Sequence, residues 1–553
     1  MDNSTEKNTT QKSGLKKWLP LAILSIGFII IILDTTILNV SLSAIINDLH
    51  TNIQSIQWVI TGYSLMIAAF TVTGGRLGDL FGRKKMFMLG AIIFGAGSFL
   101  ASISQSVGML IAGEAIIEGV GAALMTPAIM SLIVSNYKGR DRQIGFGVWG
   151  AIAGGAAALG PVVGGWITTY SSWRWAFRIN VVIVLILLIG SFFIAEAQDK
   201  EEKASLDIVG VVLSAVGLLA VVFGFIKASD YGWLTMKETI NFLGITFTQG
   251  GISLVPITIT IGAIILFLFG LWENHITKQG RTPLVNLNLF KNSQFTLAIA
   301  ITSILALGMS GLSFAIPVFL QAVKHLNPLD TGFAMLPMTL TLLIAAPLSA
   351  VISKYIAPKR IIQIGLIMGA VGFLALRAGI QVTAGQWALT PGFILFGAGM
   401  GFMMSQLSNL AISAVSVQEA GEVSGVNSTF RTVGQTLGSA VIGAILISTL
   451  ATNLVTGITN STVIPNSQKT AISQAVSKQA SSIEFGSATS ITNNQIPKVV
   501  ASEIRSISQQ ATVDATHVTL LIGAGFMLLS LLLTVKLPNE KNIEAEKSIA
   551  VGH

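Results

Sequence analysis

The sequence contains no cysteine and few charged residues, and both deficits exclude whole classes of protein. Without cysteine the chain has no disulfide, no thiol nucleophile and no cysteine metal ligand. Its five scattered histidines show no metal-ligand spacing, and no Gly-Lys-Ser/Thr phosphate-binding loop is present. Only 10% of the 553 residues are charged, whereas soluble domains carry about a quarter. We therefore expect no metal site, no cofactor and no catalytic residues.

Long apolar runs fill the sequence instead. Hydrophobic residues make up 52% of the chain, and a helix needs about 20 apolar residues to cross a bilayer. The net charge of +8 would suit nucleic acid, but the bases lie mostly in short loops, so we expect no nucleic-acid partner. The chain is predicted to be an all-α integral membrane protein. Fourteen spans are expected, near 18–42, 56–78, 86–105, 109–135, 145–169, 179–197, 206–227, 253–273, 295–320, 330–353, 360–381, 390–415, 427–451 and 516–536.

The segment 75–85 joins the second and third expected spans and reads Gly-Arg-Leu-Gly-Asp-Leu-Phe-Gly-Arg-Lys-Lys. Its glycines let helix ends approach closely, its bases mark a cytoplasmic turn, and its acid suits the positive N-terminus of another helix. The segment resembles the signature loop between helices 2 and 3 of the major facilitator superfamily of transporters. The resemblance implies a conformational gating loop that contains Gly75, Arg76, Gly78, Asp79, Gly82, Arg83 and Lys84.

The lysines and arginines indicate the orientation of the spans. With the N-terminus inside, 23 of the 33 lie in cytoplasmic segments and 10 on the opposite side. Four of those 10 lie in the long loop 453–515, where the positive-inside rule is weak. An even number of spans puts both termini on one side. We therefore expect a multi-pass protein of the cytoplasmic membrane with both termini cytoplasmic.

The resemblance also implies an organisation into two six-helix halves. The expected regions are a leader 1–17, a first half 18–197, two inserted helices within 198–280, a second half 281–536 and a tail 537–553. Residues 353–360 form a degraded echo of the signature loop at the corresponding turn of the second half. This is a major facilitator fold with 14 transmembrane helices.

The segment 453–515 differs from the rest in composition. It is rich in Ser, Thr, Asn and Gln and faces outside on the expected topology. Residues 467–482 and 495–512 are expected to form two polar helices. A solvated cap and a role in substrate capture are the two interpretations.

Asp34 lies within apolar sequence in the first expected span. A charged carboxylate inside a bilayer is costly, which makes Asp34 a functional candidate. The run 33–40, Leu-Asp-Thr-Thr-Ile-Leu-Asn-Val, resembles the helix-1 motif of the drug:proton antiporters with fourteen helices. In that family the matching Asp is implicated in proton and cation handling.

The fourth span departs from that family's pattern. The relatives carry an Arg and, four residues later, a Gln, where this chain has Glu114 and Glu118. The spacing puts both acids on one helix face, and no Asp–Arg pair with Asp34 is available. Burial and like-charge repulsion favour the protonated form of at least one acid, which suits a proton carrier. The alternative for Glu114 is a hydrated position near the outer end of the helix, so Glu118 is the stronger candidate.

The fifth span carries a glycine-rich seam with a proline. Proline frees a backbone carbonyl and bends the helix, and the glycines allow tight packing. The seam resembles the helix-5 motif of antiporters in the superfamily, and the matching residues are Gly160, Pro161, Gly164 and Gly165. Local resemblances at 172–180, 283–290 and 425–434 follow in the order expected of the family.

Together these resemblances imply a proton-coupled multidrug efflux antiporter that exports lipophilic organic cations by alternating access. The alternative is export of an endogenous lipid, peptide or antibiotic by the same fold. The expected partners are small-molecule lipophilic cations, protons and membrane lipids, without an obligate protein partner. An enzyme would need a catalytic constellation, and the sequence shows none.

Overall fold

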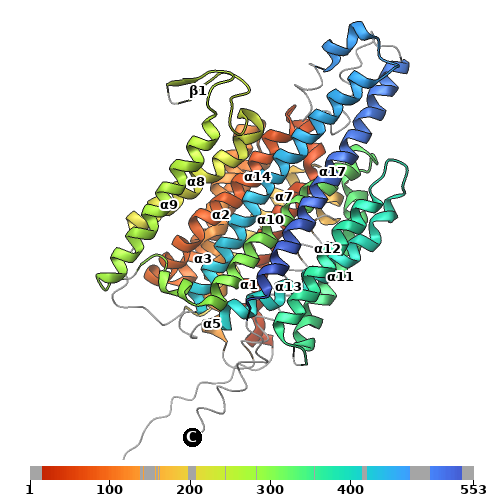
Figure 1. The fold of residues 1–553 in the computed structure, drawn as a ribbon. Coiled ribbons are helices and arrows are strands. Elements are labelled where there is room, and N and C mark those ends of the chain that lie inside the picture. Colours follow the sequence, from red (N-terminus) through yellow and green to blue (C-terminus); the bar gives the residue numbers. More distant parts are fainter. Residues whose placement is uncertain are drawn as a thin grey trace, which may run out of the picture.

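The chain folds into a bundle of long helices (Figure 1). The computed structural model describes residues 15–137, 141, 156, 160, 162–196, 207–242, 244–281, 283–353, 355–413, 420–473 and 498–537. The first half contains α1 (Leu15–Asp48), α2 (Ile53–Phe81), α3 (Arg83–Ser102), α4 (Val107–Leu110), the π-helix η1 (Ile111–Glu118), α5 (Gly119–Asn136), α7 (Arg174–Gly190) and η2 (Ser191–Phe193).

An inserted helix pair and a second half follow. The inserted helices are α8 (Ile208–Tyr231) and α9 (Leu254–Lys278), with an antiparallel hairpin of β1 (Ile240–Phe242) and β2 (Ile245–Phe247) between them. The second half contains η3 (Leu287–Lys291), α10 (Ser293–Ala322), α11 (Pro328–Ile352), α12 (Pro358–Gly379), η4 (Gln386–Leu389), α13 (Thr390–Ser413), α14 (Ala420–Asn460) and α17 (Lys498–Thr534).

Thirteen helical segments in the described ranges are long and apolar enough to cross a membrane. Each overlaps one of the expected spans, and the all-α membrane fold is confirmed. The remaining expected span, 145–169, falls mostly outside the described residues. The hairpin between the inserted helices was not anticipated from the sequence.

Polar side chains set where several helices begin. Asn52 accepts a hydrogen bond from the backbone N–H of Ser55 at 2.9 Å, which satisfies a free amide in the first turn of α2. The same kind of cap starts four later helices, at Asp207, Ser253, Asn292 and Asn327. Between α2 and α3, Gly82 has φ +103°, a conformation that favours glycine, and the chain reverses there.

Three apolar clusters show how the two halves meet. One contains only residues within 21–194 and another only residues within 289–537. The third joins residues of both halves at the end of the bundle opposite to the start of α1. We call the end where α1 begins the leader face and the opposite end the far face. The far-face cluster includes Leu38, Leu42, Ile45, Ile46, Ile56 and Val59 of the first half and Phe314, Val318, Leu446, Leu450 and Leu454 of the second.

The inserted helices pack against each other and, through α8, against both halves. Val222 of α8 lies in one apolar cluster with Leu65 of α2 and Ala440 of α14. Because α2 and α14 also contact each other directly, α8 covers a junction between the halves. The insertion is therefore part of the bundle and not a separate pair of helices.

The described parts of the polar segment 453–515, residues 453–473 and 498–515, form a helical arm at the far face (Figure 1). α14 continues to Asn460, a short helix follows at 466–473, and α17 runs from Lys498 without a break into the last span. The helix expected at 495–512 is present from Lys498, but it does not end at residue 512 and continues into the last span. Apolar side chains four residues apart, Val500 and Ile504, bury one stripe of α17 within the far-face cluster, and this packing keeps the helix continuous.

Candidate functional site

Three carboxylates from distant parts of the sequence meet inside the first half. Asp34 comes from α1, and Glu114 and Glu118 come from η1. Asp34 is 3% exposed and both glutamates are 0% exposed. One carboxylate oxygen of each acid lies within 4.8 Å of those of the other two. We call these three residues the acid cluster.

The complete burial of Glu114 corrects one expectation. A hydrated position near the outer end of the helix had been considered for Glu114, but its side chain is as buried as that of Glu118. Both acids lie in a π-helix, a rare local form that often marks functional sites. Glycines bring α3 against this segment, because a Cβ on Gly97 would lie 2.5 Å from the Glu118 backbone nitrogen.

Asn180 and Ser98 donate hydrogen bonds to two of the three acids, Asp34 and Glu118. The Asn180 amide nitrogen donates to Asp34 Oδ1 at 3.0 Å and to Glu118 Oε1 at 3.2 Å. The Ser98 hydroxyl donates to Glu118 Oε1 at 2.6 Å. Among the residues that the structure describes, both oxygens of Glu114 and the second oxygens of Asp34 and Glu118 have no hydrogen-bond partner. No described Lys or Arg forms an ion pair with the cluster.

No described basic side chain balances the negative charge of the acid cluster, and this decides what the cluster can bind. Each charged carboxylate in a membrane interior costs about 3 kcal/mol or more when it is unpaired. Three neighbouring carboxylates also repel one another, so their negative charges must be neutralised. Protons or a bound cation can neutralise them, and the cluster is therefore built to bind and release positive charge.

Sequence reasoning had not assigned roles to Asn180, Ser98 or Tyr63. Asn180 is the last residue of the run 172–180, which resembles the family's turn before helix 6. Its place in that motif was the only sequence feature that pointed to a functional role for Asn180. Near the start of α7, Arg174 pairs with Asp48 at 2.6 Å and thereby ties α7 to the end of α1. Asn180 lies less than two turns further along α7, inside the half. Tyr63 of α2 is 1% exposed and its hydroxyl has no described partner.

Little space surrounds the acid cluster. A hollow beside Asp34, lined mainly by apolar side chains such as Ile37 and Phe177, is too narrow to admit a water molecule. A drug-sized cation therefore does not fit beside the acids in this conformation. A proton or a bare metal ion needs no such room.

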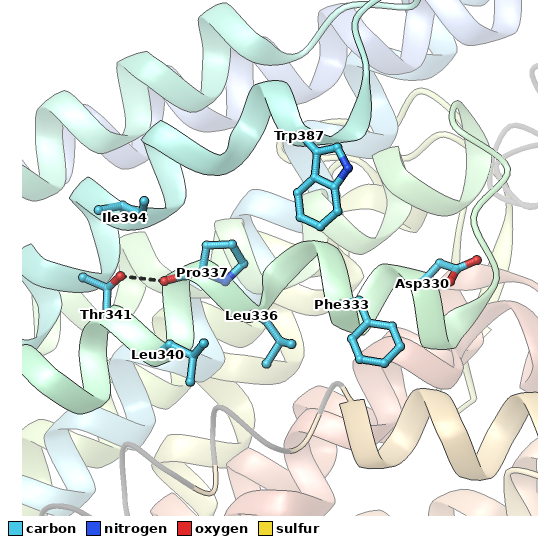
Figure 2. A pocket seen from close by; sticks show the side chains of 8 residues that line it. All are labelled: Asp330, Phe333, Leu336, Pro337, Leu340, Thr341, Trp387 and Ile394. Carbon is cyan, nitrogen blue, oxygen red and sulfur yellow. Dashed lines mark hydrogen bonds between the residues drawn. The ribbon is translucent and has the colours of Figure 1, made fainter.

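A larger groove lies in the second half between α11 and α13 (Figure 2). Its volume is about 600 Å³, and its walls are mostly apolar, with Phe333 and Trp387 as aromatic rings. Asp330 lies at one end of the groove, and its backbone N–H donates a hydrogen bond to Asn327 Oδ1 at 2.8 Å. The lining residues are Asp330, Phe333, Leu336, Pro337, Leu340, Thr341, Trp387 and Ile394. Aromatic rings next to a carboxylate suit a lipophilic cation.

Comparison with known proteins identifies the family. A profile described as Major Facilitator Superfamily matches residues 24–439. The chain belongs to this superfamily. Its members with similar sequences include the probable actinorhodin transporter of Streptomyces coelicolor, which is 30% identical over 442 residues, 79% of this chain and 73% of that protein. The puromycin resistance protein pur8 of Streptomyces alboniger is 30% identical over 447 residues, 80% of this chain and 84% of that protein.

A further relative is the multidrug efflux pump LfrA of Mycolicibacterium smegmatis, which is 27% identical over 451 residues, 81% of this chain and 84% of that protein. Among solved structures, a bacterial homologue of the human lysosomal transporter Spinster superposes with a TM-score of 0.61 at 14% identity, covering 95% of this chain and 98% of that one. The human organic anion transporter MFSD10 gives 0.57 at 11% identity, covering 94% and 99%. These two likenesses establish the fold.

As a member of the superfamily, the chain is a multi-pass membrane transporter and not an enzyme. These relatives are named as a probable antibiotic transporter, an antibiotic resistance protein and a multidrug efflux pump, which supports efflux of small molecules. The resemblance to drug:proton antiporters stated from the sequence agrees with these relatives.

The motif glycines of the fifth expected span, which is not the element α5, pack tightly against neighbouring helices. A Cβ on Gly160 would collide with the Thr36 side chain, and a Cβ on Gly164 would lie 2.9 Å from Ile37. Both contacts are on α1, within one turn of Asp34. Gly165 instead packs against the first turn of α11 in the other half. Pro161 lies outside the described residues, and the motif's role in antiport stays a prediction.

The superfamily's signature loop forms the turn between α2 and α3 at the leader face. Gly82 provides the positive φ, and the backbone N–H of Lys84 donates to Glu196 at 2.9 Å. α2 and α14 lie against each other. For Asp79 the sequence predicts docking at the start of the span 427–451, near Ser424 and Gly425. The side chains of Asp79 and of residues 420–425 are outside what the structure describes, so this contact stays a prediction.

Proposed function

We propose that the chain is a proton-coupled efflux antiporter that exports lipophilic organic cations across the cytoplasmic membrane. The observation that carries this proposal is the acid cluster, three buried carboxylates without a described basic partner inside a membrane-spanning half. Binding and release of protons is the simplest way to neutralise these acids. Asp34, Glu118 and Glu114 are then the proton-carrying residues.

The position of Asp34 connects proton binding to the gate between the halves. Asp34 and Leu38 lie one turn apart on α1, and Leu38 belongs to the far-face cluster. A change in charge at Asp34 therefore acts on the same helix that closes the far face. With the leader face on the cytoplasmic side, a closed far face corresponds to the inward-facing state of an alternating-access cycle.

We assign the cargo to a place outside the acid cluster, because the hollow beside Asp34 is too narrow for an organic molecule. The groove between α11 and α13 is the candidate cargo contact (Figure 2). Its aromatic and apolar walls suit a lipophilic body, and Asp330 suits the positive charge. Trp387→Ala and Asp330→Asn should each weaken binding of ethidium about tenfold or more. A groove that instead holds a membrane lipid would leave ethidium affinity unchanged in both variants.

Dye transport in everted membrane vesicles tests the proton coupling. A pH gradient should drive ethidium movement, and adding ethidium should in turn dissipate a preformed gradient. Asp34→Asn should abolish both effects at equal membrane abundance. Near-normal exchange by Asp34→Asn would refute the assignment of Asp34.

The cysteine-free sequence makes the orientation directly testable. Glu238→Cys in the hairpin segment should react with a membrane-impermeant maleimide in intact cells, whereas Lys85→Cys in the signature loop should react only after permeabilisation. The reverse pattern would contradict cytoplasmic termini.

Export of an antibiotic is the second candidate function, because relatives are named as a probable actinorhodin transporter and a puromycin resistance protein. Growth of cells that express the chain separates the two. Resistance to quaternary amines and dyes supports the first proposal, and resistance restricted to one antibiotic class supports the second.

A further inference from the structure

We propose that the acid cluster also binds a hard divalent metal ion, of the Mn²⁺, Ca²⁺ or Mg²⁺ class. This inference uses the same three acids as the proposed proton site and concerns a second ligand for them. The sequence showed no metal-ligand spacing, because residues 34, 114 and 118 come together only in the folded bundle.

The geometry of the three acids fits such an ion. One carboxylate oxygen from each lies within 4.8 Å of the others. Ca²⁺ binds oxygens at about 2.3–2.6 Å, so ligands on opposite sides of the ion lie roughly 5 Å apart. The three oxygens can therefore surround one ion after small movements of the side chains.

Unused polar groups are the second observation. Glu114 is fully buried, and no described N–H or O–H group from outside the cluster donates to either of its oxygens. The Tyr63 hydroxyl is also buried and has no described hydrogen-bond partner, and the Tyr63 backbone lies against Gly119, next to Glu118. Buried polar groups in native proteins are nearly always satisfied, so these atoms indicate a ligand that completes the site.

The donor set decides which metal is favoured. The cluster offers carboxylates, and Ser98 and Tyr63 add hydroxyl oxygens nearby, whereas Asn180 faces the acids with its donor nitrogen. The sequence has no cysteine thiolate, and no described histidine belongs to the cluster. Oxygen-only sites favour Mg²⁺, Ca²⁺ and Mn²⁺ over Zn²⁺ or Cu²⁺. An organic cation is excluded by the narrow hollow, but a bare ion is not.

Metal binding to the purified full-length chain tests the inference, with Mn²⁺ as the probe followed by electron paramagnetic resonance. At pH 8 we expect one bound Mn²⁺ that Ca²⁺ displaces and that Zn²⁺ displaces less well. Because the carboxylates must release protons to bind a metal, affinity should fall at least about tenfold between pH 8 and pH 6. Glu114→Gln and Glu118→Gln should each weaken binding about tenfold or more, and Tyr63→Phe about threefold.

Glu503→Gln is the matched control. Glu503 lies in the helical arm, where Ser461 donates to it at 2.8 Å, and its loss should leave Mn²⁺ binding unchanged. Thermal unfolding of every variant shows whether the fold is retained. Wild-type protein that binds no Mn²⁺ at pH 8, or Mn²⁺ binding that survives both cluster substitutions, would overturn the inference.

Ethidium binding and proton-driven transport, measured on the same preparations, separate this inference from the proposed function. Ethidium transport without Mn²⁺ binding overturns the metal site and leaves the antiporter intact. Mn²⁺ binding that depends on Glu114 but is accompanied by no proton-coupled transport supports the metal site and refutes the antiporter.

Discussion

Asn180 links Asp34 to Glu118 through one amide group, with its nitrogen 3.0 Å from Asp34 Oδ1 and 3.2 Å from Glu118 Oε1. The link connects α1, η1 and α7 across the interior of the first half. A single neutral donor is thereby shared by two acids that lack a described basic partner. Gain or loss of a proton at one acid therefore changes the hydrogen bond that Asn180 donates to the other acid.

Removal of this link should shift the pH dependence of transport. The Asn180 amide stabilises the ionised carboxylates, and a hydrogen bond to a charged group contributes about 1.5–3 kcal/mol. Asn180→Leu keeps the volume and loses the donor, so the acids hold their protons more tightly. The pH of half-maximal ethidium transport should rise by about one unit. An unchanged pH profile at normal abundance would show that Asn180 has only a packing role.

Glu114 and Glu118 should contribute comparably to the pH dependence, because both are fully buried. Glu118→Gln and Glu114→Gln each remove one titrating group and its repulsion of the remaining acids. The remaining acids then ionise more readily, and the transport profile should move to lower pH. Substrate affinity measured from pH 5 to pH 9 checks this expectation. Unchanged profiles in both variants would leave Asp34 as the only coupling acid.

Asp79→Asn should slow turnover more than it weakens binding. A carboxylate at a helix N-terminus contributes roughly 0.3–1 kcal/mol, and up to about 2 when partly buried. The upper part of this range, about 1–2 kcal/mol, biases a two-state equilibrium by about fivefold to thirtyfold. We expect ethidium efflux to slow about fivefold or more with equilibrium affinity changed by less than about twofold. Lys85→Gln in the same loop is the control, and equal slowing there would point to general charge loss.

Gly164→Ala should destabilise the protein and impair transport. The added Cβ would lie 2.9 Å from an Ile37 side-chain atom and 3.0 Å from the Ile37 Cα. Overpacking of this kind costs about 1–3 kcal/mol. Gly270→Ala is a matched control, because a Cβ there meets nothing within 4 Å. The melting temperature of both variants in detergent checks the prediction, and equal values would show that α1 adjusts without cost.

The membrane spans and the acids were predictable from the sequence for a simple reason. Apolar runs reveal spans without knowledge of their neighbours, and an acid such as Asp34 stands out against apolar sequence. The convergence of Asp34 with Glu114 and Glu118 was not predictable, because it depends on how α1, α3 and η1 pack. The close approach of Gly97 to Gly113 and Glu118 was likewise not predictable, because Gly97 belongs to another helix.

Short polar elements were harder to predict than spans. The hairpin of β1 and β2 has only three residues in each strand, too few for an alternating pattern to stand out. The first half of α17 has a polar composition typical of a loop, yet its apolar residues at 500 and 504 meet the far-face cluster. Tertiary contacts there decide the structure over composition.

The contact of α8 with Leu65 and Ala440 makes the transporter asymmetric toward the lipid. A seam is a line along which helices of the two halves meet at the lipid. When the halves move relative to each other, a molecule dissolved in the bilayer can enter the interior at a seam. Helix α8 covers the α2–α14 seam, whereas no described part of α8 lies at the seam where Gly165 meets α11. A hydrophobic compound that reaches the interior from the lipid would therefore have to pass α8 on one side of the protein.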